Sequence, residues 1–139
     1  MHPDPKRLRE ISVFAGLTGE QLDQIALWLD VEEHPARTRL TREGASGYAF
    51  FILDQGQARV ELESDTIYEL RPGDVFGEMA FFSDGRRKAD VFADTDVRVM
   101  AMFGTRFSEL QALAPEVTDR LDAIARERAA AMEGHTAAG

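Results

Sequence analysis

The segment Phe76–Val91, FGEMAFFSDGRRKADV, holds side chains that could bind an anion. Three consecutive basic residues, Arg86, Arg87 and Lys88, follow a Gly-Glu pair in a chain whose net charge is −9. A run of like charges repels itself, so it is stable either in water or beside an anion. The run alone is typical of a solvated loop. The upstream Gly-Glu pair raises the alternative of an anion pocket.

Composition excludes several other kinds of site. The chain has 25 acidic and 16 basic side chains, so it offers no bulk attraction to nucleic acid or to an anionic membrane. It has no cysteine, which excludes disulfides, thiolate metal sites and cysteine nucleophiles. The N-terminus, MHPDPKRLRE, is too polar for a signal peptide, and no apolar run approaches the roughly 20 residues that span a bilayer. We therefore expect a cytoplasmic protein.

Catalytic and metal-binding patterns are also missing from the sequence. Its three histidines, His2, His34 and His135, are widely scattered. Jelly-roll metalloenzymes instead cluster histidines at short strand spacing around a metal. No Ser-His-Asp or paired-carboxylate pattern is evident either. We expect no metal and no enzymatic activity.

The elements that must position the basic run form one domain, expected over residues 1–131. Residues from about 5 to 30 have helical patterning, and Thr18 with Gln21 fits a capping box at a helix start. The following apolar residues recur at helical spacing: Leu22, Ile25, Ala26 and Leu29.

From about residue 31 to 103 the chain consists of short β-branched or aromatic runs between turns. The runs are YAFFIL at 48–53, ARVELE at 58–63, TIYEL at 66–70 and VRVMAM at 97–102. Segments rich in Gly, Asp, Ser and Pro separate them. Many short strands at this spacing predict a mainly β fold, a jelly-roll-like double-stranded β-helix with flanking helices.

After residue 105 the pattern is helical again. Thr105 could cap a helix that ends at Leu113, and Pro115 suits the first turn of a helix through about Ala131. Residues 132–139 are expected to form a disordered tail. The second helix carries a short apolar stripe that could support a weak homodimer: Val117, Leu121 and Ile124.

Three segments together resemble the cyclic nucleotide-binding domain family. They are REG ending at Gly44, YAFFILDQGQARV from Tyr48, and LRPGDVFGEMAFF from Leu70. The resemblance covers about residues 8 to 130. It implies a helix, an eight-stranded β-roll and C-terminal helices.

The resemblance also implies a ligand site. In this family a Gly-Glu pair begins a short helix, and a phosphate-binding arginine follows the glutamate by nine residues, as Arg87 follows Glu78. Helix-start amides would cradle the cyclic phosphate, Arg87 would add a forked contact, and Glu78 would accept from the ribose 2′-hydroxyl. The implied ligand-binding residues are Gly77, Glu78, Met79, Ala80, Arg87, Lys88, Ala89 and Asp90. The side chains of Arg86 and Lys88 are expected at the surface, and Phe81 and Phe82 in packing.

Asp90 departs from the family pattern, which places Thr or Ser there and proline at the position of Arg86. An ionised aspartate cannot donate to the phosphate and would repel it. Either Asp90 turns outward to pair with Arg86 or Lys88, or it faces the pocket and weakens binding. A third possibility is that it accepts from the amino edge of guanine.

Two functions follow from the resemblance. The first is a sensor that binds cAMP in preference to cGMP, needs no cofactor, and signals to an unidentified output protein by moving its C-terminal helices. The second is an interaction or dimerisation scaffold that has lost ligand binding. Transcription factors of this family continue into a helix-turn-helix domain, whereas only about eight residues follow the last predicted helix here. Reading of DNA is therefore not expected.

Overall fold

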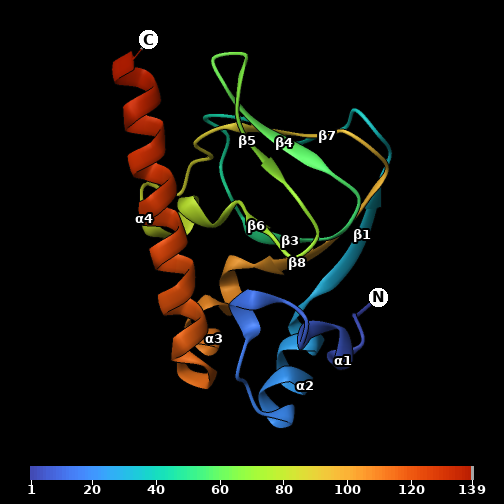
Figure 1. Cartoon of the computed structure of the whole chain (residues 1–139). Coiled ribbons are helices and arrows are strands. Elements are labelled where there is room, and N and C mark those ends of the chain that lie inside the picture. The colour runs from blue at the N-terminus through green and yellow to red at the C-terminus, as the bar shows by residue number, and fades with distance from the viewer. Residues whose placement is uncertain (139) are drawn as a thin grey trace.

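The computed structural model describes the backbone of residues 1–138 and the side chains of residues 1–134. Two four-stranded antiparallel sheets form a β-roll, with helices below it and one long helix along its side (Figure 1). The predicted mainly β fold with flanking helices is confirmed.

The two sheets have the strand orders β1-β8-β3-β6 and β2-β7-β4-β5. The strands are β1 (Asp30–His34), β2 (Arg39–Thr41), β3 (Ala49–Gln55), β4 (Ala58–Leu62), β5 (Asp65–Leu70), β6 (Val75–Phe76), β7 (Asp90–Ala93) and β8 (Val97–Phe103). The four runs read from the sequence correspond to β3, β4, β5 and β8, with ends that shift by no more than a few residues. Alternation is clearest in β4, where Ala58, Val60 and Leu62 are buried and the residues between them are not.

The N-terminal layer consists of α1 (Pro5–Leu8), the 3-10 helix η1 (Ser12–Phe14) and α2 (Gly19–Trp28). The predicted capping box is present at the start of α2. The Gln21 amide N–H donates to Thr18 Oγ1 at 3.2 Å, and the Thr18 N–H donates to Gln21 Oε1 at 2.8 Å. The Gln21 side chain also donates to the Leu113 carbonyl at 3.0 Å, which ties this layer to the C-terminal helices.

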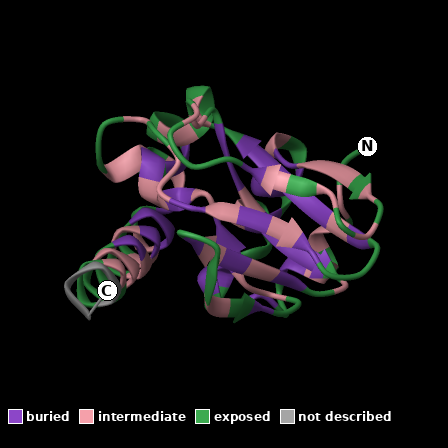
Figure 2. Cartoon of the chain, turned by 90° about the horizontal axis from the view of Figure 1, so that it is seen from above, coloured by how far each residue is buried: buried purple, intermediate pink, exposed green. Residues whose placement is uncertain are grey.

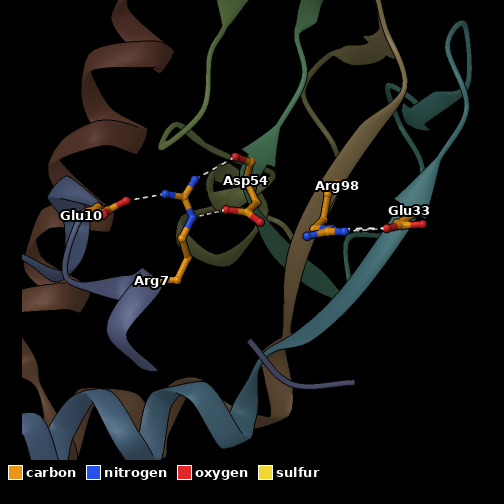
Figure 3. Close-up of polar contacts among 5 residues, drawn as sticks. All are labelled: Arg7, Glu10, Glu33, Asp54 and Arg98. Atoms are coloured by element: carbon orange, nitrogen blue, oxygen red, sulfur yellow. Dashed lines mark hydrogen bonds and ion pairs between the residues drawn. The ribbon is translucent and has the colours of Figure 1, made fainter. Parts of the chain in front are cut away.

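Ion pairs fasten the N-terminal layer and the sheet edge (Figure 3). Arg7 Nε donates to Asp54 Oδ1 at 2.6 Å and Nη2 donates to the Asp54 carbonyl at 3.1 Å, while Nη1 pairs with Glu10. Arg98 on β8 pairs with Glu33 on β1 at 2.9 Å. The first of these joins α1 to the end of β3.

The buried residues divide into two apolar clusters. Figure 2 colours buried residues purple along the strands of the roll. One lies between the N-terminal layer, the β3–β8 face and the C-terminal helices, and includes Phe14, Phe50 and Leu121. The other fills the roll and includes Leu70, Phe76 and Val91. The candidate site lies beside this second cluster.

The C-terminal helices differ from prediction at their first turn. The 3-10 helix η3 (Gly104–Arg106) precedes α3 (Phe107–Leu113), so Thr105 lies inside a tight turn. The residue at the N-cap of α3 is Arg106, and no side chain caps this helix. The predicted Thr105 cap is therefore wrong.

The long helix α4 (Pro115–Ala138) begins at proline as predicted but continues past Ala131. The expected disordered tail is wrong for residues 132–138, whose backbone is helical. Alanine is the strongest helix former, and the run Ala129–Ala131 leads directly into this stretch, whose Met132 packs against the roll cluster. Residue 139 lies outside the described residues.

The apolar stripe of α4 packs within the chain. Val117 and Leu121 have no exposed surface and belong to the cluster beneath the roll, while Ile124 is half-buried. Val117 and Leu121 are therefore not available for the predicted self-association. Among the described residues, no helix is long and apolar enough to cross a membrane.

Candidate functional site

The Gly-Glu pair lies where the chain leaves the roll and enters a short helix. Strand β6 ends at Phe76, Gly77 adopts a left-handed conformation with φ of 83°, and the 3-10 helix η2 (Glu78–Phe82) follows. A Cβ at Gly77 would come within 2.6 Å of Arg87 Nη1 and 3.2 Å of the Ala49 carbonyl oxygen. Glycine is thus required both for its backbone conformation and for the close approach of Arg87.

Arg87 lies in the loop between η2 and β7, and this loop is held by backbone hydrogen bonds. The Arg87 N–H donates to the Ala45 carbonyl at 2.7 Å, and the Gly44 N–H donates to the Arg87 carbonyl at 2.9 Å. A Cβ at Gly47 would lie 3.1 Å from Arg87 Cζ, so this second glycine also leaves room for the guanidinium. The turn at 44–47 therefore helps to position Arg87.

The guanidinium of Arg87 is half-buried without an ion-pair partner. Its Nη1 donates to the Gly77 carbonyl at 2.9 Å, and its Cζ lies 5.5 Å from the centre of the Phe51 ring. No carboxylate of the described residues lies within salt-bridge distance of it. Burial lowers the pKa of Arg87, and the nearby Glu78 carboxylate opposes that shift. Such a cation is suited to bind an anion that supplies the missing charge.

Glu78 is almost completely buried, with 1% of its surface exposed. Its carboxylate pairs with Nη1 of Arg128, a residue of α4. Burial raises the pKa of Glu78, while Arg128 and the backbone amides of Met79 and Glu78 act in the opposite direction. The same Arg128 nitrogen donates to the Val75 carbonyl at 2.5 Å.

Tyr68 of β5 completes the surroundings of Arg128. Its ring centre lies 5.0 Å from Arg128 Cζ, and burial raises the pKa of its hydroxyl to about 12. Sequence reasoning missed Arg128 because it ended the apolar stripe of α4 before ARERAA. A helical signal was available, since Arg128 follows Leu121 by seven residues and so shares its face.

The charged groups of the two basic neighbours of Arg87 bind other partners than the Arg87 guanidinium does. Arg86 is exposed and its Nη1 donates to the Gly44 carbonyl at 3.0 Å. Lys88 Nζ pairs with Asp84 at 2.6 Å, which lowers the pKa of that carboxyl. The aliphatic part of Lys88 nevertheless borders the cavities described below.

Asp90 faces away from the interior of the roll. It begins β7, in which Val91 and Ala93 are buried while Asp90 and Phe92 are only partly so. Asp90 Oδ1 accepts from the Glu43 backbone N–H at 2.8 Å. The carboxylate thus turns outward as one prediction held, but it binds a backbone amide instead of the expected Arg86 or Lys88.

A hydroxyl does lie in the interior, on a residue that the sequence did not single out. Thr41 of β2 is 6% exposed, and its Oγ1 donates to the Ala89 carbonyl at 3.1 Å. Thr41 borders the same cavity as Glu78 and Arg87. A lone threonine on a three-residue strand carries no sequence signal for such a position.

Phe81 and Phe82 pack as predicted. Phe81 contacts Phe50 edge-on with ring centres 5.7 Å apart, and both Phe81 and Phe82 meet Phe107 of α3. This cluster fixes η2 against the β3 face and α3.

Two cavities adjoin these residues. The inner one has a volume of about 30 Å³, close to that of a single water molecule. The outer one measures about 730 Å³ and lies between α4, η2 and the end of β4. Met79, Lys88 and Met132 border both. The inner cavity is lined by Thr41, Val60, Tyr68, Phe76, Gly77, Glu78, Met79, Ala80, Arg87, Lys88, Ala89, Val91 and Met132.

Seven of the eight site residues implied by the resemblance therefore lie together, and one does not. Gly77, Glu78, Met79, Ala80, Arg87, Lys88 and Ala89 line the inner cavity, whereas Asp90 does not. No group of three described His, Asp or Glu side chains is arranged to hold a metal ion.

Comparison with known proteins identifies a family and several relatives that match most of this chain. The model of the cyclic nucleotide-binding domain family matches residues 31–112. The cAMP-dependent protein kinase regulatory subunit of Aspergillus fumigatus is 32% identical over 122 residues, which cover 86% of this chain and 29% of that protein. The cGMP-dependent protein kinase egl-4 of Caenorhabditis briggsae is 33% identical over 110 residues, 74% of this chain and 15% of that protein.

Solved structures share the fold. The cAMP-bound structure of PfPKA-R superimposes with a TM-score of 0.86 at 21% identity, covering 95% of this chain and 46% of that one. The chain spans less than a third of the length of each of these two curated relatives, so it is similar to a part of each.

Proposed function

Because the chain belongs to the cyclic nucleotide-binding domain family, we propose that it is a regulatory module that binds a cyclic nucleotide, cAMP in preference to cGMP. The observation that carries this proposal is Arg87. Its guanidinium is half-buried beside the Gly77 carbonyl, without a carboxylate partner among the described residues. A cyclic phosphate would supply one negative charge and two free oxygens in reach of its fork.

Glu78 would recognise the ribose. A buried carboxylate is a strong hydrogen-bond acceptor, and a 2′-hydroxyl is a donor that deoxyribose lacks. The short chain distance between Glu78 and Arg87 brings an acceptor and a cation to the same cavity wall. This pairing matches a ligand whose hydroxyl and phosphate are carried on one sugar ring.

The outer cavity would receive the base. Its lining includes apolar side chains of the roll, of η2 and of α4, among them Leu62, Phe82 and Ala129. Guanine differs from adenine by an exocyclic amino group that a carboxylate could accept from, but the Asp90 carboxylate is turned outward to the Glu43 amide. The guanine contact considered for Asp90 is therefore lost, and cAMP stays the proposed ligand.

Signalling would proceed through α4. An inner cavity of about 30 Å³ cannot admit a nucleotide unless part of its wall moves, and Met132 of α4 belongs to that wall. Two arrangements of α4 with different affinity for the ligand would make a switch, because a ligand shifts an equilibrium only by its differential affinity for the two states. The output protein or domain would read the position of α4.

Isothermal titration of the chain with cAMP and with cGMP tests the proposal. We expect saturable binding of cAMP in the micromolar range, weaker binding of cGMP, and loss of both in Arg87→Ala. Tighter binding of cGMP would overturn the ligand assignment. Binding that persists unchanged in Arg87→Ala would overturn the phosphate site.

A scaffold without ligand is the second candidate, and the volume of the inner cavity favours it. In that case the roll would serve as an interaction module, and Arg128 would be a permanent part of the core. A folded protein that gives no heat with millimolar cAMP or cGMP would support this second function.

A further inference from the structure

Four strands of the described chain lie at the edges of the two sheets, and β5 is the longest of them. The others are β1, β2 and β6, which contain five, three and two residues, against six in β5. The edge of β1 is already partly covered, because the Val31 N–H donates to the Met1 carbonyl at 2.7 Å. Among the described residues, no strand lies beyond β5. An uncovered edge strand can pair with another extended chain.

The hydrogen bonds of the sheet show which backbone groups of β5 face this open edge. The Ala93 carbonyl on β7 accepts from the Arg37 N–H at 2.7 Å, and the Ala93 N–H donates to the Thr38 carbonyl at 2.9 Å. Both bonds lead away from β4. Ala58, which lies opposite Ala93 on β4, therefore directs its own backbone groups to the other side, where it forms a hydrogen-bonded pair with Leu70 of β5.

Glu69 precedes Leu70 and so has the opposite orientation. Hydrogen-bonded and non-hydrogen-bonded pairs alternate along an antiparallel ladder. The pair of Glu69 with Arg59 is thus of the second kind, and the N–H and carbonyl of Glu69 point away from β4 to the open edge. No described residue bonds to them there. Glu69 therefore offers one backbone donor and one backbone acceptor to an added strand.

A groove of about 410 Å³ lies between β5 and α4, and Figure 1 shows β5 between β4 and that helix. Its volume falls within the range of roughly 300–1,000 Å³ that ligand sites occupy. The register of β4 and β5 shifts between Val60 and Glu61, which leaves Ile67 as the extra residue of a bulge. A bulge changes the direction of a side chain, and the half-buried Ile67 borders this β5–α4 groove. Ile124 of α4 adds apolar surface opposite.

The charges at the β5–α4 groove favour a basic segment. Asp74 and Glu127 border it, and neither has an ion-pair partner among the described residues. Asp74 accepts from the Arg71 backbone N–H at 2.8 Å, which leaves its charge uncompensated. Among the described lining residues Arg128 is the only cation, and its guanidinium is already paired with Glu78.

We propose that the open edge of β5 binds an extended segment of a partner protein as an added strand, with a lysine or arginine of that segment in the β5–α4 groove. The backbone of Glu69 would set its register, Ile67 would contact an apolar side chain, and Asp74 and Glu127 would attract the cation. Main-chain bonds supply affinity in this mode of recognition, and side-chain pockets supply specificity. The inference is independent of cyclic nucleotide binding, and its test uses no nucleotide.

A second copy of this chain is a less suitable occupant. Pairing of two β5 strands would place the Glu69 carboxylates of both copies at one interface, and like charges across paired strands are destabilising. A basic segment has the opposite effect on the same carboxylates.

The probe is a blocked peptide, Thr-Val-Thr-Lys-Val-Thr-Val, compared with the same peptide carrying glutamate in place of lysine. Backbone amide NMR spectra of the full chain report where each peptide binds. We expect the Glu69 amide signal to shift saturably with the lysine peptide, and its hydrogen exchange to slow about tenfold at saturation. The glutamate peptide should bind about fivefold more weakly or not at all.

Two variants of Glu69 test the backbone contact. Glu69→Pro removes the outward N–H, and proline is tolerated on an edge strand at such a position. It should abolish peptide binding, whereas Glu69→Ala keeps the N–H and should retain binding.

Glu127→Gln keeps the proposal testable if Glu69→Pro folds poorly. It should weaken binding of the lysine peptide about two- to threefold. The matched control Asp119→Asn, at an exposed position of α4 outside the groove, should change nothing.

Four results would overturn the added strand. They are no shift at millimolar peptide, shifts that avoid β5, equal binding of the two peptides, and binding that persists in a folded Glu69→Pro. A Glu69 amide signal that shifts with protein concentration alone would also overturn it, because a second copy would then occupy the edge.

Discussion

Arg87 lies directly against Gly77: its Nη1 donates to the Gly77 carbonyl at 2.9 Å, and a Cβ at Gly77 would come within 2.6 Å of the same nitrogen. The contact joins the turn before η2 to the loop before β7, which are ten residues apart in the chain. It gives the candidate phosphate site a fixed geometry, because the glycine leaves room for the cation and its carbonyl orients it.

Alanine substitutions at the three positions of the basic run should have very different effects on cAMP binding. Arg87→Ala should cost about 2–5 kcal/mol of cAMP binding, a loss of tens- to thousands-fold, because it removes the charged partner of a desolvated phosphate. Arg86→Ala and Lys88→Ala should cost about 0–1 kcal/mol, since these residues contact the Gly44 carbonyl and Asp84 instead. Titration of the three variants, with circular dichroism to verify folding, measures the difference. Equal losses would reduce the run to a diffuse electrostatic patch.

Gly77→Ala should be more damaging than Gly85→Ala. Both glycines have φ near 80°, so an alanine at either position carries the strain of a left-handed conformation, about 1–2 kcal/mol. Only at Gly77 would the new Cβ collide, since nothing lies within 4 Å of a Cβ at Gly85. We expect Gly85→Ala to lose about that strain alone in urea unfolding, and Gly77→Ala to lose more and to displace Arg87. Similar unfolding midpoints in the two variants would contradict the close approach.

Substitutions of Asp90 should change the stability of the fold but not the affinity for cAMP. Asp90→Ala removes the acceptor of the Glu43 N–H, and we expect a loss of about 1 kcal/mol in the free energy of unfolding. Asp90→Asn retains an oxygen acceptor and should lose less. Asp90→Thr should not tighten cAMP binding, because the carboxylate does not face the cavity. A clear gain of affinity in Asp90→Thr would show that Asp90 turns inward during binding.

Glu78 should make stability depend on pH in a defined direction. Burial raises the pKa of Glu78 in the folded chain. At a pH between the pKa of Glu78 in the unfolded chain and its pKa in the folded chain, folding therefore takes up a proton. The contribution of Glu78 to stability is thus fully present below the unfolded pKa and is lost as pH rises through the folded pKa. The neighbouring Tyr68, with a pKa of about 12, stays neutral throughout this window.

The measurement compares urea midpoints of the wild type and Glu78→Gln at a series of pH values. Relative to the variant, the wild type should gain stability as pH falls from neutrality toward the ordinary carboxyl range. Ionisable groups common to both proteins largely cancel in the difference. A relative loss of stability on acidification would mean that the pairing with Arg128 outweighs burial and lowers the pKa of Glu78.

Local sequence patterns determined several elements of this fold. Thr18 and Gln21 form their capping box because both partners lie within one helical turn. The alternation in Ala58, Val60 and Leu62 follows from the pleat of a strand, and the nine-residue offset of Arg87 from Glu78 follows from the length of η2 and its loop. Such relations depend on residues near each other in the chain, so a single sequence displays them.

Only the tertiary structure decided which of these residues meet. The sequence could not show that Arg128, fifty residues after Glu78, is its partner, or that Asp90 turns to the Glu43 amide. Nor could it show that Val117 and Leu121 are covered by the chain itself. Each outcome depends on how α4 packs against the roll and how β2 pairs with β7 within it. Burial makes such long-range contacts decisive, because a charge removed from water must find a partner in the fold.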